Sequence, residues 1–406
     1  TTLQYQKEEM KMKKRWKKIL SVLMVGTVMV GSLTACGGDK EEKGGKSSDV
    51  KVAIICSSAG QNDNGYNQSA VKGAEKAAEE FGVECKVVEP TTGVPQALES
   101  LADDGYNVIF NLEYDFEALI QGTGGAAPIA EMYPETTFVC VNDNPNQDED
   151  GNPIHDNVIS VLFDVHQASF VAGALTTLVN ENAETLFGTD GYNFTPADNG
   201  GRSVGFIGGT NSNGITVFSY GYLEGINYEA EKFGVNYDYY AKYDAGFADS
   251  ATGSTVAGTY YNQGANVVFS VAGSVGDGAA SKAKEEGKLA IQVDANKDDQ
   301  QPGYILTSVI KNTEVPVYEI VKEAVSGKIA EMDRVQSYSL ASGAASITDL
   351  SEISKHVQES GKAKWEEIKT ELADIEKKIG DGSIQVTNAQ SGEKFDPAKC
   401  PNVTIK

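Results

Sequence analysis

Short runs of β-branched residues alternate with amphipathic helical patterns along most of the chain, and this alternation constrains the fold more than any other feature. The candidate strands are continuously apolar and are bounded by glycine and polar turns, which is typical of parallel sheets covered by helices on both faces. We therefore expect an α/β fold. The candidate strands are 51–56, 84–89, 107–112, 136–143, 157–164, 203–209, 236–243, 266–273, 289–295 and 304–311.

The alternation runs through two similar rounds, separated by a polar stretch that ends at Gly201. Two rounds of βα units in one chain predict two Rossmann-like lobes with parallel sheets, facing each other across a cleft and joined by a hinge. We expect the first lobe over 50–165, with a return segment over about 300–335. The second lobe is expected over 166–299.

The remaining C-terminal segment, 336–406, contains one clear amphipathic pattern. Its apolar residues recur at spacings of three and four, which places them on one face of a helix. We expect this helix to pack on the lobes. The apolar residues are Trp365, Ile368, Leu372, Ile375 and Ile379.

The N-terminal region has the pattern of an export signal. Met10–Lys18 is cationic, and the uncharged apolar run 19–33 is too short to span a bilayer comfortably. A plain membrane anchor would explain both features, but not the ending Leu33-Thr34-Ala35-Cys36, which matches a bacterial lipobox. We expect a lipoprotein signal peptide over 1–36 with Cys36 lipidated, followed by a flexible Gly-, Lys- and Ser-rich tether over 37–49. This predicts a lipid-anchored protein on the extracytoplasmic face of the cell membrane.

The charge balance restricts the partners. Lys and Arg number 34 against 58 Asp and Glu, so the formal net charge is −24. Binding to phosphate polymers depends on basic side chains, so this balance argues against nucleic acid as a partner and against membrane contact other than through the lipid. We expect a monomer.

The residues on which enzymes and metal sites usually depend are sparse. The three histidines, His155, His166 and His356, form neither a zinc spacing nor a catalytic triad. Cys56 and Cys140 stand at the ends of apolar runs, which is typical of buried thiols. The sequence leaves undecided whether one or two disulfides form among Cys56, Cys85, Cys140 and Cys400. We expect no metal, no cofactor and no catalytic residue.

A series of motifs resembles one family of bacterial lipoproteins. Asp63–Ala70 (DNGYNQSA) resembles the DKSFNQSA signature of the basic membrane protein family, and similar stretches follow in unbroken order to about residue 335. Their counterparts in this chain are 157–179, 203–209, 245–249, 263–276, 291–294 and 305–311. The resemblance implies a fold like that of type I periplasmic binding proteins. It also implies a lipid-anchored substrate-binding protein of an ABC importer, similar to the receptors for purine nucleosides.

The resemblance implies a binding site for the base. The aromatic residues at Tyr66 and Phe247 would sandwich a flat purine, whose faces are apolar and polarisable. The Asn67 amide would offer a donor and an acceptor to the base edge. Asp63, which opens the motif, belongs to the same expected set.

The resemblance also implies a site for the sugar. Asp294 and Lys311 match positions that contact the ribose, where a carboxylate accepts from vicinal hydroxyls and the ammonium offsets its charge. Gly273 would let backbone N–H groups approach the sugar. Glu113 and Glu117 occupy the region where nucleoside binders place two acids four residues apart.

Two positions depart from the family pattern. Ser57 stands where nucleoside binders have an aspartate, and Asn296 replaces a second acid. These departures keep open a sugar or another small polar solute as the ligand. Two further alternatives are a sensor that presents its closed form to a signalling receptor and a nucleoside-cleaving enzyme that uses Asp294 as a base.

The implied mechanism is lobe closure around the ligand, without bond-making, and recognition of the closed form by ABC permease subunits. We expect the hinges near 164–168, 292–300 and 330–336.

Overall fold

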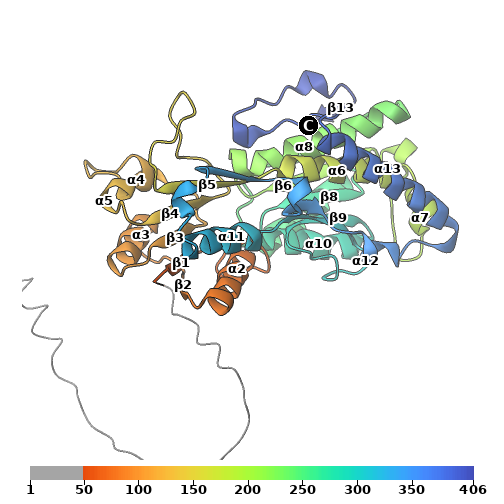
Figure 1. The fold of residues 1–406 in the computed structure, drawn as a ribbon. Helices are drawn as coiled ribbons and strands as arrows, with labels where there is room; N and C mark the ends of the chain where they lie inside the picture. The colour runs from red at the N-terminus through yellow and green to blue at the C-terminus, as the bar shows by residue number, and fades with distance from the viewer. Residues whose placement is uncertain (1–48) are drawn as a thin grey trace, which may run out of the picture. The chain divides into compact units, whose positions relative to one another are not determined.

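The computed structural model describes residues 49–406, and their strands form two separate sheets (Figure 1). The first sheet has six strands in the order β11-β5-β4-β3-β1-β2, and all neighbours are parallel. These strands are β1 (Lys51–Ile55), β2 (Glu84–Val88), β3 (Val108–Asn111), β4 (Thr137–Val141), β5 (Val158–Phe163) and β11 (Val335–Tyr338).

The second sheet has seven strands in the order β12-β10-β9-β8-β6-β7-β13. Its neighbours are parallel except that β12 runs antiparallel to β10. These strands are β6 (Ser203–Gly208), β7 (Tyr237–Lys242), β8 (Val267–Val271), β9 (Leu289–Asp294), β10 (Ile305–Lys311), β12 (Ala345–Ile347) and β13 (Val403–Ile405). The predicted α/β fold with two parallel-sheet lobes is thereby confirmed. Every residue of β5, β6 and β8 is buried, as the continuous apolar runs predicted.

Helices cover both sheets. In the first lobe α2 packs against α11, and in the second α6 packs against α8 while α9 packs against α10. The pair α6 and α8 approaches closely because both carry glycines: a Cβ on Gly173 would lie 2.1 Å from the carbonyl oxygen of Tyr222. The helices are α2 (Tyr66–Phe81), α3 (Val94–Asp103), α4 (Glu117–Ile120), α5 (Ile129–Met132), α6 (Val165–Asn180), α7 (Ala183–Phe187), α8 (Asn213–Phe233), α9 (Ser250–Asn262), α10 (Ser274–Glu286), α11 (Glu314–Val325), α12 (Ser351–Ser354) and α13 (Lys362–Gly380).

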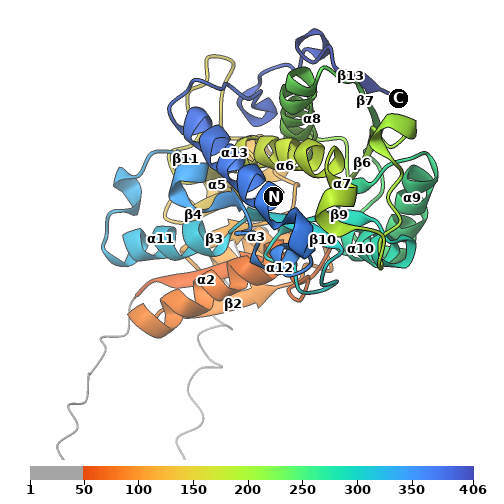
Figure 2. The ribbon, with the colours of Figure 1, turned by 90° about the vertical axis from the view of Figure 1, so that its right-hand side faces the viewer.

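The predicted amphipathic helix of the C-terminal segment is α13. All five of its predicted apolar residues are buried, and the helix lies across α6 (Figure 2). Among the described helices, none combines the length and the apolar character that crossing a membrane requires.

The chain crosses between the lobes at places that differ in part from the predicted hinges. It leaves the first sheet after β5 through Asp164, which lies in the predicted hinge 164–168. It returns through 312–313, between β10 and α11, and crosses again through 339–344, between β11 and β12. The predicted hinges at 292–300 and 330–336 do not coincide with these crossings, because each of the two segments lies inside a single lobe.

The predicted lobe boundaries need two corrections. The return segment 300–335 was assigned to the first lobe, but β10 pairs with β9 in the second sheet, and only α11 and β11 belong to the first lobe. The segment 336–406 also supplies β12 and β13 to the second sheet. An apolar run predicts a buried strand, but it does not show which of two similar sheets the strand joins. The predicted signal peptide 1–36, its Cys36 and most of the tether 37–49 lie outside the described residues.

Candidate ligand-binding site

A cavity lies between the two sheets, and apolar side chains and a few polar ones line it, as in many small-molecule sites. Its walls come from both lobes and gather at the carboxyl ends of the strands, where ligands bind in open parallel sheets. The cavity is lined by Ser57, Ser58, Ala59, Asp63, Tyr66, Glu113, Tyr114, Ile215, Phe247, Val271, Ala272, Gly273, Val293, Asp294 and Lys311.

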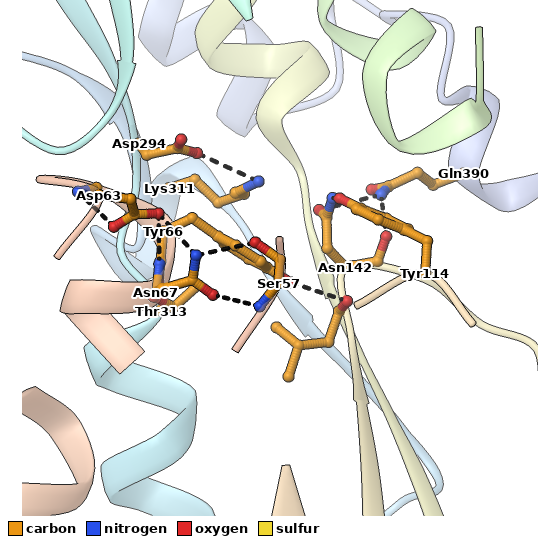
Figure 3. Close-up of polar contacts among 12 residues, drawn as sticks. Ser57, Asp63, Tyr66, Asn67, Tyr114, Asn142, Asp294, Lys311, Thr313 and Gln390 are labelled. Carbon is orange, nitrogen blue, oxygen red and sulfur yellow. Dashed lines mark hydrogen bonds and ion pairs between the residues drawn. The ribbon is translucent and has the colours of Figure 1, made fainter. Parts of the chain in front are cut away.

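A buried ion pair forms the polar end of the cavity. Lys311 ends β10 and Asp294 ends β9, and Lys311 Nζ lies 3.2 Å from Asp294 Oδ1 (Figure 3). The two side chains are only 5% and 12% exposed. Burial by itself lowers the pKa of Lys311, but the charge of Asp294 and the nearby Tyr114 outweigh burial and raise that pKa above its ordinary value. The lysine therefore stays charged at neutral pH.

Asp294 also has an unusual backbone. Its φ of +75° lies in the left-handed region, which is unfavourable for a residue with a side chain. Such strain costs on the order of 1–3 kcal/mol and is concentrated at functional sites. The strained backbone and the ion pair together hold the carboxylate in the cavity.

Tyr66, the first residue of α2, is a wall of the cavity and also part of the core. Its hydroxyl donates to the carbonyl oxygen of Val141 at 3.1 Å, and Lys311 Nζ lies 4.4 Å from its ring centroid. Burial raises the pKa of Tyr66 well above its ordinary range. Because the ammonium covers one face of the ring, a ligand can contact only the rest of it.

Phe247 lies in the loop after β7 and is only partly buried. Its ring lies against Gly209, where an added Cβ would come 2.3 Å from Phe247 Cε1. Its carbonyl oxygen accepts from Ser274 N at 2.8 Å. Gly273, the residue before Ser274, has φ +54° and passes close to the carbonyl oxygen of Phe247. A residue without a side chain is therefore needed at this position for the loop to pack against α10. Phe247 and Gly273 therefore line the cavity as one unit.

The acidic start of the DNGYNQSA motif organises the beginning of α2. Asp63 accepts from the backbone N–H groups of Gly65, Asn67 and Gln68 at 3.0–3.1 Å, so it satisfies donors that the helix leaves free. The same carboxylate accepts from Asn67 Nδ2 at 2.9 Å. Asp63 thus lines the cavity while it holds the first turn of the helix.

Asn67 was predicted to bind the edge of a base, and in the structure its amide is taken up by protein partners. The side chain is fully buried and does not line the cavity. Its Oδ1 accepts from Ser57 N at 2.8 Å, and its Nδ2 donates to Ser57 Oγ and Asp63 Oδ2. Its amide therefore ties the end of β1 to α2.

Of the two predicted acids in the 113–117 region, only Glu113 lies at the cavity. Glu113 follows β3 and lines the cavity, and it accepts from Ser58 N at 2.6 Å. Burial raises the pKa of Glu113. Glu117, the other predicted contact, begins α4, is exposed and does not line the cavity. Four residues place two acids on one face only inside a helix, and Glu113 precedes the helix.

Several lining residues were missed or undervalued. Ser57, treated only as a departure from a pattern, lines the cavity, and so does Tyr114, whose hydroxyl accepts from Asn142 Nδ2. Both follow a strand of the first sheet within three residues. The rule that sites gather at strand carboxyl ends provides a signal for them. The other departure, Asn296, is exposed and its Oδ1 accepts from Asp298 N.

The cysteines of the described residues are free thiols. Burial raises the pKa of Cys56 to about 12 and that of Cys85 to about 11, so neither is a reactive thiolate at neutral pH. Within residues 49–406, no group of three or more acids, histidines and cysteines is arranged to hold a metal ion.

Comparisons with known proteins show the family and the fold. Residues 50–379 match the family model described as ABC transporter substrate-binding protein PnrA-like. The chain is 27% identical over 318 residues to an uncharacterized lipoprotein of Pyrococcus abyssi, covering 76% of this chain and 72% of that protein. It is 26% identical to the ABC transporter nucleoside-binding protein BmpA of Lactococcus lactis, covering 82% of this chain and 91% of that protein. A solute-binding protein of an ABC transporter system from Aeropyrum pernix has a similar fold, with a TM-score of 0.68 and 21% identity over 84% of this chain and 93% of that one.

Proposed function

The chain belongs to the PnrA-like family of ABC transporter substrate-binding proteins, and from this premise we propose that its cleft binds a purine nucleoside. The family membership makes it a binding protein of an importer, not an enzyme. The observation that carries the proposal is the position of the Asp294–Lys311 pair beside two aromatic residues in one cavity. A nucleoside has the matching halves: a flat apolar base and a sugar with vicinal hydroxyls.

The base occupies the apolar side of the cavity. Phe247 presents a partly exposed ring from the second lobe, and the aliphatic side chains of Ile215, Val271 and Val293 line the same cavity. Aromatic stacking and apolar burial favour a purine over a smaller pyrimidine, because a purine offers a larger face. Tyr66 supplies the opposite wall through the part of its ring that Lys311 leaves open.

The sugar occupies the polar side. The carboxylate of Asp294 accepts from ribose hydroxyls, and Lys311 Nζ donates to a hydroxyl oxygen while it stays paired with Asp294. Because the pair neutralises itself, a neutral ligand enters without leaving a buried charge unpaired. The acids Asp63 and Glu113 offer further acceptors on the lobe-1 side.

Closure of the lobes over the ligand then makes the surface that ABC permease subunits recognise. The lipidated Cys36 holds the receptor on the extracytoplasmic face of the membrane. The lipobox pattern and the lipoprotein names of relatives support this placement.

A thermal-shift panel on ligand-stripped protein tests the ligand class. We expect purine nucleosides to raise the melting temperature most, pyrimidine nucleosides less, and ribose or free purine least, since a ligand stabilises the folded state in proportion to RT ln(1 + [L]/Kd). A larger shift with ribose or another sugar than with any nucleoside would replace the nucleoside with the sugar that Ser57 and Asn296 left open.

A further inference from the structure

The C-terminal tail, residues 381–402, follows α13 and leads to β13. Strand β13 pairs in parallel with β7 at the edge of the second sheet, with Val403 opposite Tyr237. The family model ends at residue 379, so the tail lies beyond the matched part of the chain. What the tail does is therefore not given by the family match.

The tail is fixed to the second lobe along its length. The carboxylate of Glu224 on α8 accepts from Thr387 N at 2.9 Å and from Thr387 Oγ1. Further along, the ring of Phe395 stacks on that of Tyr220 with centroids 4.6 Å apart and planes at 6°. Close to β13, Asn402 N donates to Asn227 Oδ1 at 2.9 Å. These contacts, all to α8, hold the tail on one lobe.

One residue of the tail reaches the other lobe. Gln390 lies in the short 3₁₀ helix η5 (Ala389–Ser391), and its Nε2 donates to the carbonyl oxygen of Asn142 at 3.0 Å and to Asn142 Oδ1 at 3.3 Å (Figure 3). Asn142 follows β4 of the first sheet and is fully buried. The tail therefore bridges the two lobes.

Asn142 connects this bridge to the ligand cavity. Its Nδ2 donates to the hydroxyl of Tyr114, which lines the cavity. Its φ of +69° is in the left-handed region, which asparagine tolerates better than most residues. The start of α8 in the second lobe comes to the same place, where a Cβ on Gly214 would lie 3.1 Å from Asn142 Nδ2 and 3.4 Å from Tyr114 Cε1. Asn142 is thus the point at which tail, α8 and cavity wall meet.

We infer that the C-terminal tail is a strap that holds the lobes closed, and that Gln390 is a positioning residue for Tyr114 through Asn142. The strap is anchored on α8 on both sides of Gln390, which makes a pair of hydrogen bonds to the opposite lobe, so those bonds exist only when the lobes are together. Opening the cleft breaks them. The strap therefore slows ligand release without touching the ligand. The strap itself does not depend on which ligand binds, although its effect on release rests on the proposed function.

Two variants of the full chain test the strap. Gln390→Ala removes the donor, and Gln390→Glu keeps the size but turns an acceptor toward two acceptor oxygens. Gln385→Ala changes an exposed glutamine of the same tail and is the matched control. The ligand-free readout is hydrogen exchange of peptides covering 140–145 and 212–218, the two sides of the interface. The second readout is the dissociation rate of inosine, guanosine and adenosine by stopped flow.

We expect faster exchange on both sides of the interface in Gln390→Ala, a larger effect in Gln390→Glu and none in Gln385→Ala. Nucleoside release should accelerate roughly fivefold in Gln390→Ala, the factor that one lost hydrogen bond produces, while exchange in the tail stays as in the wild type. Unchanged exchange in both Gln390 variants would overturn the strap. If the wild type binds none of the three nucleosides, the proposed function fails, and the exchange data still decide the strap.

Discussion

The ammonium group of Lys311 lies 4.4 Å from the ring centroid of Tyr66, although the two residues belong to different lobes. Lys311 ends a strand of the second sheet, whereas Tyr66 begins α2 of the first lobe. A cation over an aromatic face is attracted by the ring, so this contact favours the closed arrangement of the lobes. The same ammonium is paired with Asp294 of the second sheet, so Lys311 links the polar end of the cavity to an aromatic wall from the first lobe.

The Asp294–Lys311 pair should show strong coupling in stability. Asp294→Asn leaves a buried ammonium without its partner, and removing one member of a buried pair costs about 3–5 kcal/mol. We expect urea denaturation to show such a loss for the single variant and a smaller loss for Asp294→Asn combined with Lys311→Met. Strictly additive losses would show that the two groups do not depend on each other.

Phe247→Ala should weaken the binding of purine nucleosides far more than the binding of ribose. The partly exposed ring provides the stacking face, and aromatic contacts contribute roughly 0.5–1.5 kcal/mol beyond the apolar area they bury. We therefore expect a drop in affinity of at least about tenfold for the nucleosides, with Phe247→Leu intermediate. Equal losses of affinity for nucleoside and ribose, measured by calorimetry, would show that Phe247 does not contact the base.

Gly209→Ala should reduce nucleoside binding while the protein stays folded. The added Cβ would lie 2.3 Å from Phe247 Cε1, so the ring has to move away from its place in the cavity. Gly380→Ala is the matched control, because a Cβ there has no neighbour within 4 Å. Affinity and circular dichroism of both variants check this, and wild-type affinity in Gly209→Ala would mean that the ring position is unimportant.

Nucleoside monophosphates should bind much more weakly than nucleosides. The cavity lining contains three acids, Asp63, Glu113 and Asp294, against the single cation Lys311, and the chain carries a net charge of −24. A phosphate adds about −1.5 to −2 charges, which these acids repel. Competition between adenosine and its 5′-monophosphate is the measurement. Comparable affinities that fall together with rising salt would point to a cationic phosphate site.

Lys288 should give the stability a distinctive pH dependence. Its ammonium is buried, it donates to Asn266 Oδ1 and Thr195 Oγ1, and burial lowers its pKa from 10.5 to about 8. Between about pH 8 and 10.5 the unfolded chain holds a proton that the folded chain has lost, so the free energy of unfolding rises with pH in this window.

The check compares this profile with that of Lys288→Met, which lacks the titrating group. The difference, wild type minus variant, should be constant below about pH 8 and grow above it. Parallel profiles across the window would contradict the assignment.

The two lobes could be predicted from the sequence because continuous apolar runs such as β5 are typical of buried parallel strands. Asp294 and Lys311 were expected in the site from the family resemblance alone, and they come together because their parallel strands end at the same edge of the sheet. The pairing of the Asn67 amide with Ser57 and Asp63 could not be predicted, because it depends on how the end of β1 meets the start of α2. The Gln390–Asn142 contact joins positions 248 apart and has no local signal.

The nucleoside site can be tested by calorimetric titration of the ligand-stripped wild-type chain with inosine, guanosine and adenosine. We expect micromolar or tighter binding of at least one of them at one site per chain, abolished in Asp294→Asn. Absence of binding heat for all three, at several temperatures and with the protein shown to be folded, would contradict the nucleoside site and leave only the family's general role as a solute-binding protein.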